Sequence, residues 1–168
     1  MHSLPFENIR KVIAHKKLLE KKLKVKILIK KKFITISGTE ENEYFAVKVF
    51  EAIDADFPID ISLLIADSPE EYMIEHLSIK EFTRRPNLAE VRARIIGRKG
   101  KTKQIIEDLS NCYISLHENT VSIIGNTEDI GRATQAITKL IQGSKQSSVY
   151  GFLEKSGRRF YSNLGLKK

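Results

Sequence analysis

The second half of the chain carries apolar residues with two different periods. From about residue 88 to 95, and again from about 101 to 109, apolar side chains recur three and four positions apart, which predicts two successive helices. Residues 112–116 and 120–124 are short runs rich in β-branched and aromatic side chains, which predicts two strands. The polar residues between the strands predict a compact turn, in which Asn119 is suited to a positive φ.

A strand is expected before these elements and two helical segments after them. Residues 72–78 can supply the first strand, and Gly125-Asn126-Thr127 breaks the chain before a further helix. The apolar face of that helix is Ile130, Ala133, Ile137, Leu140 and Ile141. The tail, 146–168, is a basic amphipathic segment. Its expected packing residues are Val149, Tyr150, Phe152, Leu153 and Phe160, and its outward cations are Lys155, Arg158 and Arg159.

Between the two successive helices lies the turn Gly97-Arg98-Lys99-Gly100, with a glycine at each end and two cations between them. Glycine has no Cβ, so both ends can bend sharply and let another backbone approach. The helix that begins at about Lys101 directs free N–H groups and the positive end of its dipole toward the turn. These features favour a nucleic-acid backbone, and the turn resembles the GxxG loop of KH domains. The alternative is a surface turn with two solvated cations.

The resemblance implies a groove that clamps about four nucleotides of a single strand. Gly97 and Gly100 would allow close approach, and Arg98 and Lys99 would meet phosphates. The apolar floor would come from Ile95, Ile105 or Ile106. Tyr113 would either stack on a base or belong to the core. The candidate RNA-binding residues are Ile95, Ile96, Gly97, Arg98, Lys99, Gly100, Lys101, Thr102, Lys103, Ile105, Tyr113 and Ile114.

The first half of the chain has a similar pattern. Residues 1–6 predict an edge strand that is limited by a proline, and residues 25–29 and 33–37 predict two more strands. Residues 9–23 have helical periodicity with an expected interruption at 14–17. The half therefore shows the same order of elements as the second half, which indicates an internal duplication.

The remaining elements of the first half follow a break at residue 38. Thr39 is expected to cap a helix with a Glu-rich first turn, which suits the positive end of the helix dipole. The face of that helix is predicted to carry Tyr44, Ala46, Val47 and Phe50. Residues 61–66 predict a helix that joins or braces the two halves, and Asp67-Ser68-Pro69 is the clearest break in the chain.

We therefore predict an α+β fold with two tandem KH-type domains in the type I order strand, helix, helix, strand, strand, helix. Each domain would be a three-stranded antiparallel sheet backed by helices, with limits at 1–66 and 69–168, the latter including the helical tail. In the first domain Ala14-His15-Lys16-Lys17 would correspond to the glycine-flanked turn. Because it contains neither glycine, the first domain is interpreted as degenerate and is expected to bind RNA more weakly.

Composition favours an anionic partner. The net charge is +8 and the pI is about 9.5. The charges are grouped in three blocks along the chain. Residues 1–32 carry eleven Lys/Arg against two Glu, residues 39–75 carry eleven Asp/Glu against one Lys, and residues 80–105 carry nine Lys/Arg against two Glu. No apolar run approaches the ~20 residues that span a bilayer. The single Cys112 excludes an internal disulfide and a cysteine zinc site. We expect no membrane association and a cytoplasmic location.

Three motifs together resemble the archaeal branch of the Partner-of-NOB-one family, the pre-ribosomal KH proteins of the small subunit. They are residues 95–102 (IIGRKGKT), residues 120–125 (TVSIIG) and residues 148–155 (SVYGFLEK). The last motif is more diagnostic than GxxG, because a generic KH domain does not need it. Residues 1–85 match this family only in the order of their elements.

The resemblance implies a non-catalytic RNA-binding assembly factor in rRNA processing, without a cofactor. Such a protein would bind the 3′-terminal region of small-subunit ribosomal RNA, and a monomer is expected. Its implied protein partners are the nuclease that trims this RNA and the alpha subunit of translation initiation factor two. The alternative is a general KH RNA-binding protein, or a protein-interaction adaptor in RNA processing or translation initiation that uses the acidic block 39–75.

An enzyme is the competing class. The four histidines are dispersed without metal-ligand spacing. Asp54, Asp56 and Asp60 could form a magnesium-binding nuclease cluster, but their position beside Pro58 more simply predicts a solvated acidic turn. We therefore expect neither catalytic residues nor a metal site.

Overall fold

The computed structural model describes the backbone of residues 1–163 and 165, and the side chains of residues 1–158 and 165. The chain divides into two compact units, Met1–Ile74 (the N-terminal unit) and Glu75–Lys168 (the C-terminal unit). Each contains a three-stranded sheet and helices, so the α+β class is confirmed. The predicted break at residues 67–69 lies between the last helix of the N-terminal unit and the next strand. The domain limits 1–66 and 69–168 stay a prediction.

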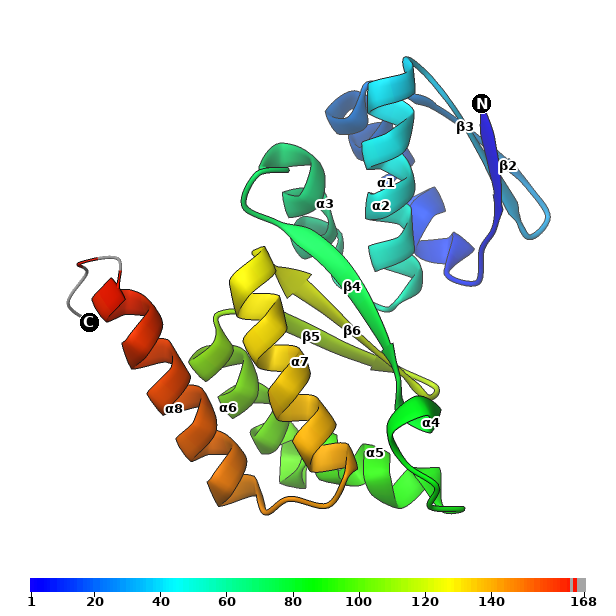
Figure 1. Ribbon diagram of the computed structural model, residues 1–168. Helices are drawn as coiled ribbons and strands as arrows, with labels where there is room; N and C mark the ends of the chain where they lie inside the picture. The colour runs from blue at the N-terminus through cyan, green and yellow to red at the C-terminus, as the bar shows by residue number, and fades with distance from the viewer. Residues whose placement is uncertain (164, 166–168) are drawn as a thin grey trace. The chain divides into compact units, whose positions relative to one another are not determined.

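The N-terminal unit has its strands in the order β1-β3-β2, with both neighbouring pairs antiparallel (Figure 1). Strand β1 is an edge strand that ends at Pro5, where the missing N–H costs no ladder hydrogen bond. The elements are β1 (His2–Pro5), α1 (Ile9–Leu23), β2 (Lys26–Lys30), β3 (Phe33–Ser37), α2 (Glu40–Asp54) and α3 (Ile59–Asp67).

Helix α1 is continuous, and the predicted interruption at 14–17 is wrong. Ala14, Lys16 and Lys17 are good helix formers, so nothing in this stretch stops the helix. Val12 and Leu19, two turns apart, are both fully buried, which places one uninterrupted face on the core. The N-terminal unit therefore has one helix where the predicted KH order has two, and no turn corresponds to Gly97–Gly100.

Helix α2 begins as predicted. Thr39 is its N-cap, and its Oγ1 accepts a hydrogen bond from the Asn42 N–H at 3.3 Å. Ala46 and Phe50 are fully buried. Tyr44, however, is 59% exposed, because it lies beside the buried stripe of the helix rather than on it.

The C-terminal unit has the order strand, helix, helix, strand, strand, helix, with one short helix inserted and one long helix appended (Figure 1). Its strands lie in the order β4-β6-β5, and β5 and β6 form an antiparallel hairpin. The elements are β4 (Met73–Ser78), α4 (Ile79–Phe82), α5 (Leu88–Ile96), the 3₁₀ turn η1 (Arg98–Gly100), α6 (Lys101–Ser110), β5 (Tyr113–His117), β6 (Thr120–Gly125), α7 (Thr127–Ile141) and α8 (Gln146–Asn163).

The turn between β5 and β6 differs from the prediction in one residue. The positive φ belongs to Glu118, at 50°, and not to Asn119. Asn119 instead joins the turn to its surroundings: its Oδ1 accepts a hydrogen bond from the Arg92 guanidinium, and its carbonyl accepts one from the Ile79 N–H at 2.9 Å. These two contacts connect the hairpin to α5 and to the end of β4.

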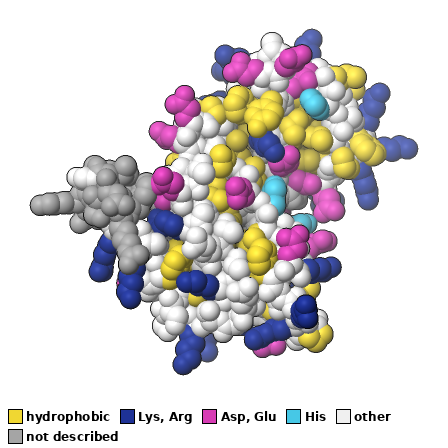
Figure 2. Space-filling view, viewed as in Figure 1, with side chains coloured by type: hydrophobic (Ala, Val, Ile, Leu, Met, Phe, Trp, Pro, Cys, Tyr) yellow, Lys and Arg dark blue, Asp and Glu magenta, His cyan; other side chains and the backbone are white. Residues whose placement is uncertain are grey.

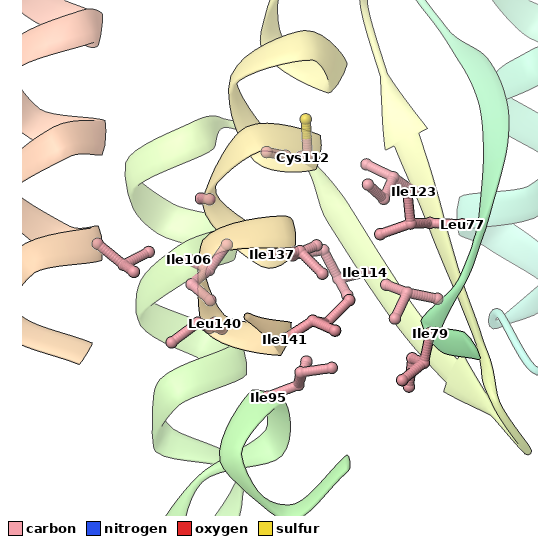
Figure 3. Packing of buried hydrophobic residues seen from close by; sticks show 14 of the residues in the cluster. Leu77, Ile79, Ile95, Ile106, Cys112, Ile114, Ile123, Ile137, Leu140 and Ile141 are labelled. Carbon is pink, nitrogen blue, oxygen red and sulfur yellow. The ribbon is translucent and has the colours of Figure 1, made fainter. Parts of the chain in front are cut away.

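The core of the C-terminal unit lies between the sheet and the helices (Figure 3). Helix α7 contributes its whole predicted apolar face, and every member of that face is at most 1% exposed. Helix α8 adds Val149 and Leu153, both fully buried, while Tyr150 and Phe152 pack against the same core. Lys155 and Arg158 are exposed, as predicted. The side chains of Arg159 and Phe160 lie outside the described residues.

Cys112 belongs to this core, and its thiol is expected to be unreactive. Burial raises the pKa of the Cys112 thiol to about 12, although a hydrogen bond to the Ser110 carbonyl acts in the opposite direction. The thiol therefore stays protonated at neutral pH and is a poor nucleophile. None of the helices in the described part of the chain is long and apolar enough to cross a bilayer.

A single arginine joins three helices of the C-terminal unit. Arg132 on α7 is partly buried and forms an ion pair at 3.0 Å with Asp129, which is buried. Its guanidinium also donates to the Leu109 carbonyl of α6 at 2.9 Å and to the Leu153 carbonyl of α8 at 3.0 Å. Gly157 passes so close that a Cβ there would lie 2.7 Å from Arg132 Nη2. Arg132 therefore holds α8 on the rest of the unit.

We expect Arg132→Ala to lower the free energy of unfolding by about 3 kcal/mol, because the Asp129 carboxylate would lose its ion-pair partner while remaining buried. Urea unfolding followed by circular dichroism measures the change. The matched control is Arg158→Ala, which removes an exposed arginine of α8 and should change the unfolding free energy by less than about 0.5 kcal/mol. Equal stability of the two variants would contradict the assigned role of Arg132.

Candidate nucleic-acid interface

The predicted basic turn joins α5 to α6 through an irregular backbone. Helix α5 is closed by the Gly97 N–H, which donates to the Ala93 carbonyl at 2.8 Å. The next residues turn through η1 and include three with left-handed φ: Gly97 at 75°, Lys99 at 54° and Gly100 at 74°. Helix α6 then begins at Lys101. The turn is therefore a fixed local structure within which only Lys99 adopts positive φ with a side chain.

A side chain would meet different surroundings at the two glycine positions. A Cβ on Gly97 would lie 2.1 Å from Thr102 Oγ1 and 2.7 Å from the Thr102 backbone nitrogen. A Cβ on Gly100 would meet no atom within 4 Å. Gly97 is thus required by packing inside the protein, whereas Gly100 leaves open surface where a ligand backbone can approach.

The base of the turn is held by the start of α8. Thr102 is 4% exposed, and its Oγ1 accepts a hydrogen bond from Gln146 Nε2 at 2.9 Å. Close by, Arg94 Nη2 donates to the Ser144 carbonyl at 2.7 Å. Thr102 was a predicted contact residue, but in the structure it lies beneath the turn and is engaged by Gln146. Its position supports the turn from below.

The turn presents uncompensated positive charge. Arg98, Lys99 and Lys101 are exposed, and none of the three has an acidic partner among the described residues. Lys103, one turn further along, forms an ion pair with Glu107 at 3.2 Å. Gly100, the N-cap of α6, supplies no side-chain hydrogen bond to the first turn of that helix. The Lys101 N–H donates to the Arg98 carbonyl, and no side chain caps the rest of the first turn of α6. The positive end of the helix dipole and the adjacent cations give this turn a geometry that suits an anion.

A hollow of about 600 Å³ opens beside the turn. Its lining comes from the end of α5 and from the β5–β6 hairpin: Arg92, Ile96, Leu116, Glu118 and Asn119. Ile96, the last residue of α5, is 38% exposed, so a ligand can reach this apolar side chain next to the basic turn. The hollow therefore combines an apolar floor with a carboxylate, an amide and a guanidinium.

Several predicted contact residues lie elsewhere. Ile95, Ile106 and Ile114 are at most 3% exposed and belong to the core, so they cannot form the floor of a groove. Ile105 is half-buried. Tyr113 is 37% exposed and lies outside the core cluster, but it is at the opposite end of β5 from the hollow.

Four residues that line the hollow were not predicted as contact residues, because the sequence pattern indicates their position only weakly. They are Arg92, Leu116, Glu118 and Asn119. Arg92 precedes Ile96 by four positions, so the two share one face of α5. Leu116 shares a strand face with Ile114, two positions before it. Glu118 and Asn119 were recognised as turn residues, but periodicity does not show that the turn folds back to α5.

The acidic residues considered for metal binding serve as structural acceptors. Asp54 Oδ1 accepts hydrogen bonds from the backbone N–H groups of Glu7 and Asn8, at 2.9 and 3.2 Å. Asp56 forms an ion pair with Lys11 at 3.2 Å. The part of the chain that the structure describes contains no cluster of three or more His, Cys, Asp or Glu side chains that could hold a metal ion.

Comparison with known proteins agrees with this geometry. A family model for the second domain of PNO1, described as a eukaryotic type KH-domain (KH-domain type I), matches residues 73–158, just over half of the chain. The chain belongs to the PNO1-type KH family. The matched range contains the basic turn, the hollow and the first part of α8. The PNO1 resemblance inferred from the three sequence motifs is therefore confirmed.

Two curated relatives and one solved structure extend the match beyond that domain. A KH domain-containing protein of Methanocaldococcus jannaschii is 30% identical over 86% of this chain and 66% of its own length. The pre-rRNA-processing protein pno1 of Aspergillus fumigatus is 34% identical over 76% of this chain and 50% of its own length. This chain thus spans about half to two thirds of the length of these curated PNO1-type relatives.

The solved structure is the a/eIF2alpha–aDim2p–rRNA complex of Pyrococcus horikoshii, in which a chain 32% identical superimposes with a TM-score of 0.84. The match covers 94% of each chain. It includes the N-terminal unit, which lies outside the family model.

Substitution by alanine should lower the stability of the protein by different amounts at the two glycines of the basic turn. We expect Gly97→Ala to lower the free energy of unfolding by about 3 kcal/mol, through overpacking against Thr102 and the cost of a positive φ. Gly100→Ala meets open space and should cost only about 1 kcal/mol, from φ alone. Urea unfolding of both variants tests this difference, and similar stabilities would show that the Gly97–Thr102 contact does not constrain the turn.

Proposed function

We propose that this chain is a non-catalytic, single-stranded RNA-binding assembly factor of the small ribosomal subunit. The observation that carries the proposal is the uncapped N-terminus of α6 beside Arg98 and Lys99. This site suits phosphate groups, and the neighbouring hollow is open to bases. The fold and family membership support a KH type of recognition.

Each part of the site has a role in the proposal. Arg98, Lys99 and the N–H groups of α6 hold two or more phosphates, and the bare surface at Gly100 allows the strand to approach. A base then lies on Ile96 and Leu116. Glu118 and Asn119 offer hydrogen-bond acceptors and donors to the base edges, which are accessible only when the RNA is unpaired.

The proposed target is the 3′-terminal region of small-subunit ribosomal RNA. The support is the name of the Aspergillus relative, a pre-rRNA-processing protein, and the rRNA present in the complex of the Pyrococcus relative. The same complex supports the alpha subunit of translation initiation factor two as a protein partner. The nuclease that trims the RNA is a further proposed partner, by resemblance to the family. Binding at Tyr113, Ile105 and Lys103 also stays a prediction.

Charge reversal at the turn tests the site. We expect Arg98→Asp combined with Lys99→Asp to weaken binding of single-stranded RNA by more than about tenfold, since two like charges would face the phosphates. The measurement is fluorescence anisotropy with a labelled oligonucleotide of the rRNA 3′ end. The fold should survive, because both side chains are exposed and neither has an acidic partner in the part of the chain that the structure describes.

A matched control keeps the change of net charge constant. Lys155→Asp combined with Arg158→Asp reverses two exposed cations of α8 and should change the affinity much less than the turn variant. Equal losses in the two double variants would mean that the overall charge attracts RNA. The basic turn would then have no special role.

The target can be tested with RNA of defined pairing. We expect the free 3′-terminal segment to bind at least about tenfold tighter than the same segment annealed to its complement, a difference of roughly 1.4 kcal/mol. Base edges in a duplex are paired and cannot enter the hollow. A scrambled single strand is the control for sequence. Equal binding of the scrambled strand would leave a general RNA-binding protein and would remove the ribosomal assignment.

A further inference from the structure

The sheet of the N-terminal unit has one face on the core and one face in solvent. Ile27, Ile34 and Ile36 alternate along β2 and β3 and are at most 3% exposed. The residues between them point the other way, as the period of a strand requires. Among them, Leu28 and Phe33 are each 52% exposed. The Phe33 side chain on this three-stranded sheet is thus about half exposed to solvent.

The strand register surrounds this phenylalanine with a defined set of neighbours. Phe33 pairs with Lys30 on β2 and with Pro5 on β1. Leu28 pairs with Thr35 in the next outward-facing row. We call this surface the outer sheet face. It comprises Pro5, Lys26, Leu28, Lys30, Phe33 and Thr35.

Positive charge frames the outer sheet face. Lys26 and Lys30 stand on β2 itself, and Lys31 and Lys32 form the turn that leads into Phe33. All four lysines are exposed, and none has an acidic partner among the described residues. Figure 2 shows Lys and Arg side chains beside hydrophobic ones over the region where Figure 1 draws β2 and β3. This concentration is distinct from the basic turn of the C-terminal unit.

We propose that the outer sheet face is a second RNA-binding surface, on which one base of a single strand stacks on Phe33 while Lys26, Lys30 and Lys31 hold the phosphates. An aromatic ring on a basic surface is the arrangement that binds single strands without sequence preference, since every base has a π face. Lys26 and Lys30 are four strand positions apart, about 13 Å, so they can reach phosphates on opposite sides of a stacked base.

The size of the apolar surface favours RNA over a protein partner. A stable protein interface buries about 800 Å² on each side around a continuous apolar centre. The outer sheet face offers only Leu28 and Phe33 as exposed large hydrophobic side chains, surrounded by lysines. Two apolar side chains can serve one or two bases, but they are few for a protein interface. The lack of a glycine-flanked turn in this unit predicts weaker and less selective binding than at α6.

Tryptophan fluorescence tests this surface directly, because the chain contains no tryptophan. Phe33→Trp is made in the full chain that also carries Arg98→Asp and Lys99→Asp. These two changes are expected to remove RNA binding at the basic turn. The probe is a 12-nucleotide oligouridine. We expect its addition to quench the emission of the Phe33→Trp variant, and added salt to restore it. The control is Tyr44→Trp in the same background, an exposed aromatic position on α2 whose emission should not change.

Affinity measurements provide a second readout in the same background. Phe33→Ala should weaken the residual binding of labelled oligouridine by about fivefold or more, as expected for the loss of one stacked base. Lys26→Ala combined with Lys30→Ala should flatten the salt dependence. Unchanged emission of the Phe33→Trp variant, or unchanged affinity of Phe33→Ala, would overturn the proposal. Quenching by a polyglutamate peptide that oligouridine does not displace would also overturn it, and would assign the surface to an acidic protein.

Discussion

The contact between Gly97 and Thr102 is the constraint on which the basic turn depends. Gly97 lies so close to the side chain and backbone nitrogen of Thr102 that even a methyl group would not fit between them. This closeness lets α5 end and α6 begin within a few residues, with Lys99 and Gly100 in left-handed conformations. The N–H groups at the start of α6 thereby come to lie beside Arg98 and Lys99. The geometry that the proposed phosphate site needs thus follows from packing within the protein.

The N-terminal unit shows what positive charge provides without such a turn. It holds all the lysines of the first charge block, yet α1 runs unbroken through the stretch that would have to bend. Positive charge alone attracts any phosphate backbone and carries no sequence information. Under the proposed function, selectivity would depend on the C-terminal unit, where Glu118 and Asn119 line a hollow next to the basic turn.

Sequence periodicity predicted the C-terminal unit well, because its elements are short, strongly patterned and separated by glycine, asparagine or proline. It failed where the decisive information was not local. No breaker residue occurs near Ala14, so the expectation of an interruption rested only on analogy with the second half. Ile95 and Ile96 are adjacent and chemically identical, yet one is in the core and the other reaches the hollow. The rotation of α5 against the sheet decides between them, and this rotation depends on long-range packing.

Helix α8, which is appended to the KH order of elements, helps to fix the basic turn. Val149 and Leu153 fix the helix on the core, and Arg132 ties its backbone to α6 and α7. With α8 held in this way, Gln146 at its first turn is positioned to donate to Thr102 beneath the basic turn. Docking of α8 therefore contributes to the geometry of the basic turn, although α8 itself lies outside the lining of the hollow. The SVYGFLEK motif therefore acts on the basic turn through packing, because the helix that it holds on the core also carries the Gln146 side chain that donates to Thr102.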